Sequence, residues 1–257
     1  ASYLVAYART FRLDVRTGTE AIRVEPADDG SWQVTTPDGP LAARVCVLAT
    51  GANRLPRVPV VPGRERFRGP VLHSSQVRNG RELAGRRVLV VGLGNSGGDL
   101  AADLARRGAR VSVSVGAPGG PVLPLRIGPL SWRTATLLVP GAVTALARRV
   151  GLGSLGWRAS GAVWAAIQER HAGDLRALGL PLPTERELGN PALWGRPPLT
   201  SSAVLDAVRR GEIELLPRLV ALEERSAVVG GGRAVDVEAV LFATGFRHGL
   251  EELLPGR

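Results

Sequence analysis

The chain has 257 residues, of which 44% are apolar and 22% charged, a composition that excludes disorder over most of its length. A single cysteine, Cys46, excludes an internal disulfide or a CxxC redox pair, and with only three histidines it also disfavours a zinc site. The net charge of +10 comes from arginine alone, because lysine is absent. No RNP, zinc-finger or leucine-zipper pattern accompanies this charge, so we predict no nucleic-acid partner.

The first 70 residues combine a helix, short strands and a proline-rich connector. Residues 2–12 have apolar side chains on one helical face, and a continuous apolar strand is predicted at 43–48. Four prolines between residues 55 and 70 favour an extended connector. Turn residues at 28–30 and 37–39 separate strand-like runs and so predict a small antiparallel meander, with strands at 13–16, 19–24 and 32–35.

A glycine-rich turn carries the strongest signal in the sequence. The apolar run 87–91 predicts a buried strand, which leads directly into Gly92-Leu93-Gly94-Asn95-Ser96-Gly97 and then a helix to about residue 107, with Gly108 as its C-cap. In such a turn the first glycine permits a tight bend, the second lets a pyrophosphate approach the backbone, and the third lets the helix pack on the strand. Backbone N–H groups of residues 95–97 then point at the anion. We therefore predict a dinucleotide site.

The remainder of the chain alternates between predicted strands and helices. A second strand is predicted at 110–115, mostly helical structure at 130–195, a helix at 199–210, and strands at 213–216 and 235–242 around a turn at 230–232. The apolar stretch 134–147 is interrupted by Pro140 and Gly141 and is shorter than the roughly 20 residues that a bilayer span needs. We interpret it as a buried helix pair, with an interfacial anchor as the minor alternative.

The end of the second predicted strand indicates which dinucleotide binds. An NAD site usually ends this strand with a carboxylate for the ribose diol, yet residues 111–117 (VSVSVGA) contain none. A 2′-phosphate would fit that gap, so NADP is favoured over NAD. The nearby arginines Arg107, Arg110 and Arg126 are the predicted partners of this phosphate.

Several motifs together resemble one enzyme family. Residues 67–73 (FRGPVLH) have the form FxGxxxH and precede the glycine-rich turn, and an Ala-Thr-Gly tripeptide stands on either side of this unit, at 49–51 and at 243–245. The arrangement resembles the class B flavin-dependent monooxygenases. It is most similar to the flavin-containing monooxygenases, including the plant auxin-forming type, and less similar to the Baeyer–Villiger enzymes.

The resemblance implies an α/β flavoprotein with two dinucleotide-binding domains, in which a Rossmann-like NADP domain is inserted into an FAD domain. Residues 1–66 and 223–257 would then belong to a truncated FAD domain. Residues 67–82 would form the connector, and residues 83–222 the NADP domain with a helical insert. Each Ala-Thr-Gly tripeptide would mark a crossing between the domains. The predicted cofactor-binding residues are Gly92, Gly94, Asn95, Ser96, Gly97, Arg110, Arg126, Ala49, Thr50, Gly51, Thr244 and Gly245.

The resemblance also implies a cytoplasmic oxidoreductase that uses FAD, NADPH and O₂. NADPH would reduce the flavin, and a C4a-peroxyflavin would transfer one oxygen atom to a nucleophilic nitrogen or sulfur compound or to an α-keto acid. No catalytic side chain or metal is expected, because the cofactor carries the chemistry. Two alternatives are an electron-transferring FAD/NAD(P) reductase and an inactive nucleotide-binding fragment.

Three departures from the family pattern qualify this interpretation. The fingerprint for FAD is expected upstream of residue 1, so the chain is interpreted as an internal fragment that holds FAD poorly and is itself inactive. Val77 stands where the family often has an aromatic residue, Trp or Asp. Gly116 stands where the family has an arginine at the end of the second NADP strand, which weakens the preference for NADP.

His73 is interpreted either as a reporter of domain docking or as a histidine hydrogen-bonded within a turn.

Overall fold

The computed structural model describes residues 2–116, 122–124, 126–151, 156–184, 187–188 and 198–255. The chain forms two compact units. Unit 1 contains residues 1–57 and 245–257, and unit 2 contains residues 58–244. The division therefore falls at 57/58 and 244/245, whereas the sequence-based boundaries were placed at residues 66 and 222. Which cofactor each part serves stays a prediction.

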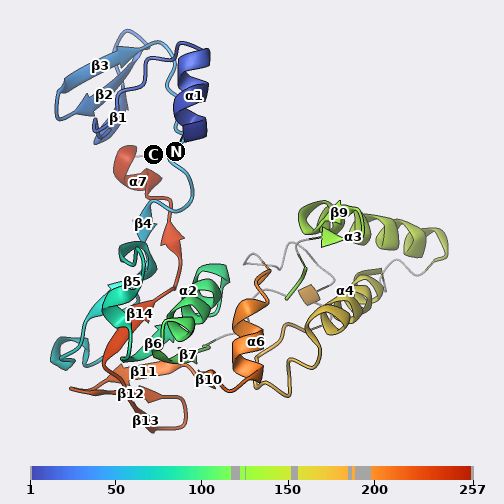
Figure 1. Ribbon diagram of the computed structural model, residues 1–257. Coiled ribbons are helices and arrows are strands. Elements are labelled where there is room, and N and C mark those ends of the chain that lie inside the picture. The colour runs from blue at the N-terminus through green and yellow to red at the C-terminus, as the bar shows by residue number, and fades with distance from the viewer. Residues whose placement is uncertain are drawn as a thin grey trace. The chain divides into compact units, whose positions relative to one another are not determined.

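Unit 1 begins with a helix and a three-stranded antiparallel sheet (Figure 1). The predicted helix is confirmed as α1 (Ser2–Thr10). An antiparallel meander is present as predicted, but its strands are β1 (Arg23–Pro26), β2 (Trp32–Thr36) and β3 (Gly39–Ala43), so that only the strand expected at 32–35 keeps its place. Gly30 and Gly39 adopt the positive φ that the two turns require. The unit is completed by β4 (Leu55–Pro56), which pairs with β15 (Phe246–Arg247), and by α7 (Leu250–Leu253).

Two strands predicted in unit 1 do not form. Residues 13–16 are not in a strand, and the apolar run 43–48 continues β3 only to Ala43 before it leaves the sheet. Val45 and Val47 are 76% and 80% exposed. A strand needs a neighbour to take up its backbone N–H and C=O groups, and no described residue pairs with 44–48. The apolar sequence alone was therefore not sufficient to make this strand.

Unit 2 is built on a five-stranded sheet in which every neighbouring pair is parallel. The predicted strand 87–91 is confirmed residue for residue as β6. The order across the sheet is β10 (Ile213–Leu216), β7 (Arg110–Ser114), β6 (Arg87–Val91), β14 (Ala239–Phe242) and β5 (Val71–His73). The chain moves from β6 outward to β7 and β10, while β14 is added on the other side of β6. The direction of winding thus reverses between β6 and β14, which in open α/β sheets marks the ligand crevice.

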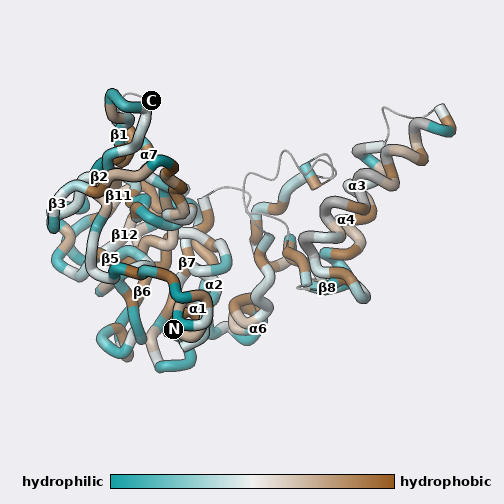
Figure 2. Tube along the Cα trace, turned by 90° about the horizontal axis from the view of Figure 1, so that it is seen from above, coloured by the Kyte–Doolittle hydropathy of each residue, from teal (hydrophilic) through white to brown (hydrophobic). Residues whose placement is uncertain are grey.

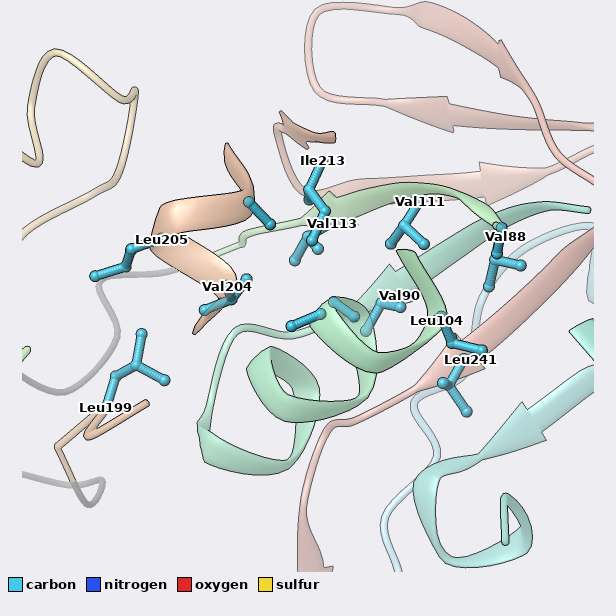
Figure 3. Close-up of a cluster of buried hydrophobic side chains, with 14 of the residues drawn as sticks. Val88, Val90, Leu104, Val111, Val113, Leu199, Val204, Leu205, Ile213 and Leu241 are labelled. Atoms are coloured by element: carbon cyan, nitrogen blue, oxygen red, sulfur yellow. The ribbon is translucent and has the colours of Figure 1, made fainter. Parts of the chain in front are cut away.

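The two faces of this sheet are covered by different kinds of layer. Alternate residues of β6 point to opposite faces, so Val88 and Val90 pack under helices while Leu89 packs on the other side. The helical layer consists of α2 (Asn95–Arg106) and α6 (Ala203–Arg209). Figure 3 shows how side chains from this layer and the sheet converge: Val88, Val90, Leu104, Val111, Val113, Leu199, Val204, Leu205, Ile213 and Leu241.

The opposite face carries an antiparallel meander that the sequence did not predict in this form. Its strands are β11 (Leu219–Leu222), β12 (Ser226–Val229) and β13 (Arg233–Asp236). The turn at 230–232 joins β12 to β13, and not the two strands expected to flank it. The meander buries Leu222, Ala227 and Val229 against Leu89 and Phe242. Short 3₁₀ turns at Arg64–Arg66, Ser74–Gln76 and Arg81–Leu83 complete this part of the unit.

A long crossover between β7 and β10 contains a helical pair. The hairpin of β8 (Arg126–Ile127) and β9 (Leu130–Ser131) precedes α3 (Trp132–Arg149), which packs on α4 (Gly156–Ala172). The expected break at Pro140 and Gly141 does not occur, because α3 runs through both. Both helices contain hydrophobic and hydrophilic residues (Figure 2). Among the described residues, no helix has the length and apolar character that a membrane span requires. Trp164 is fully buried in this region.

Candidate functional site

The glycine-rich turn lies at the carboxyl edge of the parallel sheet, directly after β6. Helix α2 begins at Asn95, with Gly94 as its N-cap residue, and the predicted C-cap Gly108 has φ +85°. No side chain caps the start of α2. The N–H groups of a first helical turn have no intrahelical acceptor, and they carry the positive end of the helix dipole. The N–H groups of Asn95, Ser96 and Gly97 therefore lie where an anion could bind, and that they bind a dinucleotide stays a prediction.

The three glycines of the turn differ in whether the structure leaves room for a side chain. Gly92 has φ +104°, and a Cβ there would lie 2.8 Å from the carbonyl oxygen of Ala243. A Cβ on Gly97 would collide with the carbonyl oxygen of Gly92, so this position is closed by backbone. Gly94, in contrast, has extended backbone and nothing within 4 Å of an added Cβ. The turn is thus tightly packed from behind and open at Gly94, which is the geometry that a pyrophosphate needs.

The second Ala-Thr-Gly tripeptide begins beside this turn. Ala243 follows β14, its N–H donates to the carbonyl oxygen of Val91 (2.9 Å), and its Cβ would lie 3.2 Å from a Cβ on Gly97. Ala243 and Thr244 therefore lie beside the glycine-rich turn, at the carboxyl ends of β6 and β14 within unit 2. Gly245, with φ +86°, belongs to unit 1, where its carbonyl oxygen accepts from the N–H of Arg57 (2.9 Å). The first tripeptide, Ala49, Thr50 and Gly51, also lies in unit 1, and Gly51 has φ +74°.

The side chain of Asn95 holds a distant segment against the start of α2. Its Nδ2 donates to the carbonyl oxygen of Pro198 (2.9 Å), while its Oδ1 accepts from the backbone N–H (2.9 Å) and the Oγ1 (3.2 Å) of Thr200. Asn95 was predicted to bind the cofactor through its backbone N–H, and the bonds of its side chain to residues 198–200 leave that N–H available. Partners more than 100 positions apart leave no local signal in the sequence.

We expect Asn95→Ala to loosen the segment 198–200 and to weaken dinucleotide binding about tenfold. The variant leaves the Thr200 N–H without its partner, a cost of about 1–3 kcal/mol if the site stays closed to water. Protection of the amides of 198–202 against hydrogen exchange should fall together with NADP⁺ affinity. Asn79→Ala, which removes an amide that accepts from the N–H of Arg81 in an exposed turn, is the matched control. Unchanged protection at 198–202 would contradict this role for Asn95.

None of the three predicted arginines contacts the glycine-rich turn in the described structure. Arg110 is the first residue of β7 and pairs with Arg87 across the sheet, so it lies about 13 Å from the carboxyl end of its strand. Arg107 follows the last turn of α2, and its Nε donates to Asp103 (2.7 Å). This bond is the main reason why the pKa of Asp103 is lowered. Arg126 donates to the carbonyl oxygen of Pro129 within the β8–β9 hairpin. Arg110 and Arg107 thus lie toward the amino edge of the sheet, opposite the glycines.

A serine that the sequence reading missed organises the end of the second strand. Ser114 is the last residue of β7 and only 2% exposed, and its carbonyl oxygen accepts from the N–H of Gly92 (3.0 Å). Its Oγ donates to the carbonyl oxygen of Pro217 (3.0 Å) and accepts from the N–H of Leu219 (2.8 Å). The turn after β10 is thereby attached to the carboxyl edge beside the glycine-rich turn.

The FxGxxxH motif forms the end of β5 and the turn after it. Phe67 is buried, and a Cβ on Gly69 would collide with the carbonyl oxygen of Glu238, so this glycine permits a close backbone approach. His73 is 2% exposed, and its Nδ1 accepts from the N–H of Ser75 (3.2 Å) while its own N–H donates to Gln76 Oε1 (2.7 Å). Of the two interpretations of His73, the hydrogen-bonded turn is the one that these contacts show.

Ser96 and Asp99 are both exposed on α2. Among the tryptophans of residues 130–195, Trp164 lies in the core, Trp194 lies outside the described residues, and the side chains of Trp132 and Trp157 are not described. In the part of the chain that the structure describes, no group of three or more His, Cys, Asp or Glu is arranged to hold a metal ion.

Comparison with known proteins gives matches along the whole chain. Residues 1–119 match the family model "Pyridine nucleotide-disulphide oxidoreductase". Indole-3-pyruvate monooxygenase YUCCA1 of Oryza sativa subsp. japonica is 29% identical over 98% of this chain and 60% of its own length. YUCCA8 of O. sativa subsp. indica is 31% identical over 98% and 59%. The probable YUCCA4 of Arabidopsis thaliana is 26% identical over 98% and 59%.

The chain is thus similar along its length to the class B flavin-dependent monooxygenases, as its motifs indicated. Solved monooxygenase structures share its fold. NADP⁺-bound cyclohexanone monooxygenase from Rhodococcus sp. Phi1 has a TM-score of 0.67 at 20% identity over 100% of this chain and 58% of that one. A flavin-containing monooxygenase from Stenotrophomonas maltophilia has a TM-score of 0.61 at 20% identity over 99% and 58%. The chain spans about 60% of the length of the curated relatives it matches.

Proposed function

We propose that unit 2 binds NADPH and that the protein in its full length is an FAD- and NADPH-dependent monooxygenase. In this proposal the NADP domain is inserted into an FAD domain, to which unit 1 contributes. The observation that carries the proposal is the open position at Gly94, between a closed Gly97 and the uncapped start of α2. A packed turn without a ligand would have no need to keep this position free of side chains.

The described residues fit the diphosphate of a dinucleotide. Backbone N–H groups of residues 95–97 supply donors and the positive end of a helix dipole. Ala243 and Thr244 lie beside the turn at the carboxyl ends of β6 and β14, the position where open α/β sheets bind their ligands. When bound, NADPH supplies a hydride to the flavin. The part of this chain is to hold the diphosphate, to place the dinucleotide against the crevice, and to keep residues 198–200 closed over the helix start through Asn95.

An α-keto acid is the substrate class that we propose. The curated relatives are named as indole-3-pyruvate monooxygenases, and their similarity covers 95–99% of this chain. The structural neighbour named as a cyclohexanone monooxygenase shares only the fold at 20% identity, so a cyclic ketone is the weaker choice. Amines and sulfides, the other compounds that the sequence suggested, serve as comparison substrates.

Oxygen-dependent NADPH consumption tests this function. The full-length protein should consume NADPH with O₂ and convert indole-3-pyruvate to an oxygenated product with one atom of ¹⁸O from ¹⁸O₂. Reduction of ferricyanide or cytochrome c without product oxygenation would instead favour the electron-transferring reductase. Full-length protein that purifies without flavin and cannot be reconstituted with FAD would favour the inactive nucleotide-binding protein.

A further inference from the structure

An arginine from a different strand lies at the end of β7, where this chain has neither a carboxylate nor an arginine of its own. Arg218 stands in the turn between β10 and β11. Its Cγ, Cβ and Cδ atoms lie 3.1, 3.4 and 3.5 Å from the position that a Cβ on Gly116 would take. The aliphatic stem of Arg218 therefore fills the space that a side chain at residue 116 would need. The absence of a side chain at Gly116 thus makes room for the stem of Arg218.

The backbone that carries Arg218 is fixed on both sides. Ser114 Oγ bonds to the carbonyl oxygen of Pro217 and to the N–H of Leu219, the two neighbours of Arg218. The carbonyl oxygen of Arg218 itself accepts from the N–H of Gly230 (2.9 Å). Because Ser114 also bonds to Gly92, two residues before Gly94, the arginine and the glycine-rich turn share one edge of the sheet. The backbone of Arg218 is therefore already fixed before a ligand binds.

The charge of Arg218 is not used within the described structure. Among the described residues it takes part in no ion pair and no side-chain hydrogen bond, whereas Arg107, Arg210 and Arg233 each pair with a carboxylate. Its side chain is exposed at the carboxyl edge. A guanidinium presents a planar set of donors that matches a phosphate group, and it keeps its charge at all physiological pH values.

We propose that Arg218 binds the 2′-phosphate of NADP(H), supplied from the β10–β11 turn in place of a residue at 116. In a dinucleotide-binding sheet the ribose 2′ position lies at the carboxyl end of the second strand, which here is β7. The inference rests on the proposed binding of NADPH at the glycine-rich turn. It replaces Arg107, Arg110 and Arg126, which the sequence suggested, with a residue on a later part of the chain.

Nucleotide affinities of single variants test the assignment. In the full-length protein, Arg218→Ala and Arg218→Gln should each weaken NADP⁺ and 2′,5′-ADP binding about tenfold to a hundredfold, the loss expected for one charge-assisted contact. NAD⁺ and 5′-AMP affinities should stay unchanged. Arg225→Ala is the matched control, because Arg225 is also an exposed arginine of the meander. Its carbonyl oxygen accepts from the N–H of Val237, which directly precedes the segment leading into β14, so Arg225 lies at the opposite edge of the sheet. It should leave all four affinities unchanged.

A swap of the arginine sharpens the test. The double variant Gly116→Arg/Arg218→Gly moves the guanidinium to the end of β7 and removes the stem that Gly116 accommodates, so it should recover most of the NADP⁺ preference lost in Arg218→Gly. If Arg218→Ala keeps its NADP⁺ affinity while Gly94→Val loses it, the role of Arg218 is overturned and the proposed function stands. Equal loss of NADP⁺ and NAD⁺ in Arg218→Ala also overturns it. Binding of neither nucleotide by the unsubstituted protein overturns both proposals.

Discussion

A Gly94→Val variant is expected to lose NADP⁺ affinity about a hundredfold or more while remaining folded. The valine side chain would occupy the open position where the backbone approaches the diphosphate, so that about two charge-assisted hydrogen bonds, near 3 kcal/mol together, are lost. The backbone at Gly94 is extended, which valine adopts without strain, and only its weaker N-capping costs up to about 1 kcal/mol of stability. Calorimetric titration with NADP⁺ and urea unfolding measure the two effects separately.

Gly97→Ala is the comparison that makes this result specific. Its Cβ would collide with the carbonyl oxygen of Gly92, so it should lower the free energy of unfolding by more than Gly94→Val does. Gly94→Ala, with a smaller obstruction, should fall between the wild type and Gly94→Val in affinity. If Gly94→Val kept its NADP⁺ affinity, the turn would not be the diphosphate site, and the proposed function would lose its main support.

Phe242→Ala is expected to lower the free energy of unfolding by about 3–5 kcal/mol, the largest stability effect that we predict. The ring is fully buried at the end of β14, between the sheet and the meander, together with Leu89, Leu222 and Val229. Its removal leaves a cavity that a rigid sheet cannot close. Urea unfolding followed by far-UV circular dichroism measures the loss.

Val60→Ala provides the control for this core substitution. Val60 is 98% exposed, so its truncation should change the free energy of unfolding by no more than about 0.5 kcal/mol. A loss below about 1 kcal/mol in Phe242→Ala would show that the meander does not pack on the sheet as described. Because Phe242 directly precedes Ala243, the variant should also bind NADP⁺ less tightly at urea concentrations that leave the wild type folded.

The strand, turn and helix of residues 87–108 could be predicted almost completely, because their signals are local. Only neighbouring residues in the sequence determine strand β6, the three glycines, helix α2 and the positive φ of Gly108 after it. The periodicity and the turn chemistry therefore carry the information. The resemblance to the monooxygenases, based on short motifs, agrees with the matches along the whole chain.

The parts that could not be predicted depend on partners far away in the sequence. The run 43–48 has the composition of a strand, but a strand forms only with a neighbour, and no described residue pairs with it. Asn95 bonds to residues about 105 positions later, and Arg218 packs on Gly116 from 102 positions away. Proximity along the chain favoured Arg107 and Arg110, yet a parallel strand places its first residue at the edge opposite its last. Strand direction, more than distance in sequence, decides which charges can reach the turn.

The position of β14 has a consequence for synthesis of the protein. This strand, made of residues 239–242, fills the place between β5 and β6, which are translated about 150 residues earlier. Until residue 242 has left the ribosome, β5 and β6 have open edges that face each other, and the glycine-rich turn lacks its contact with Ala243. Such long-range pairing slows folding and leaves strand edges open to wrong partners. Nascent chains that stop short of β14 should therefore depend on chaperones, and productive folding of this unit is expected only after translation has passed its last strand.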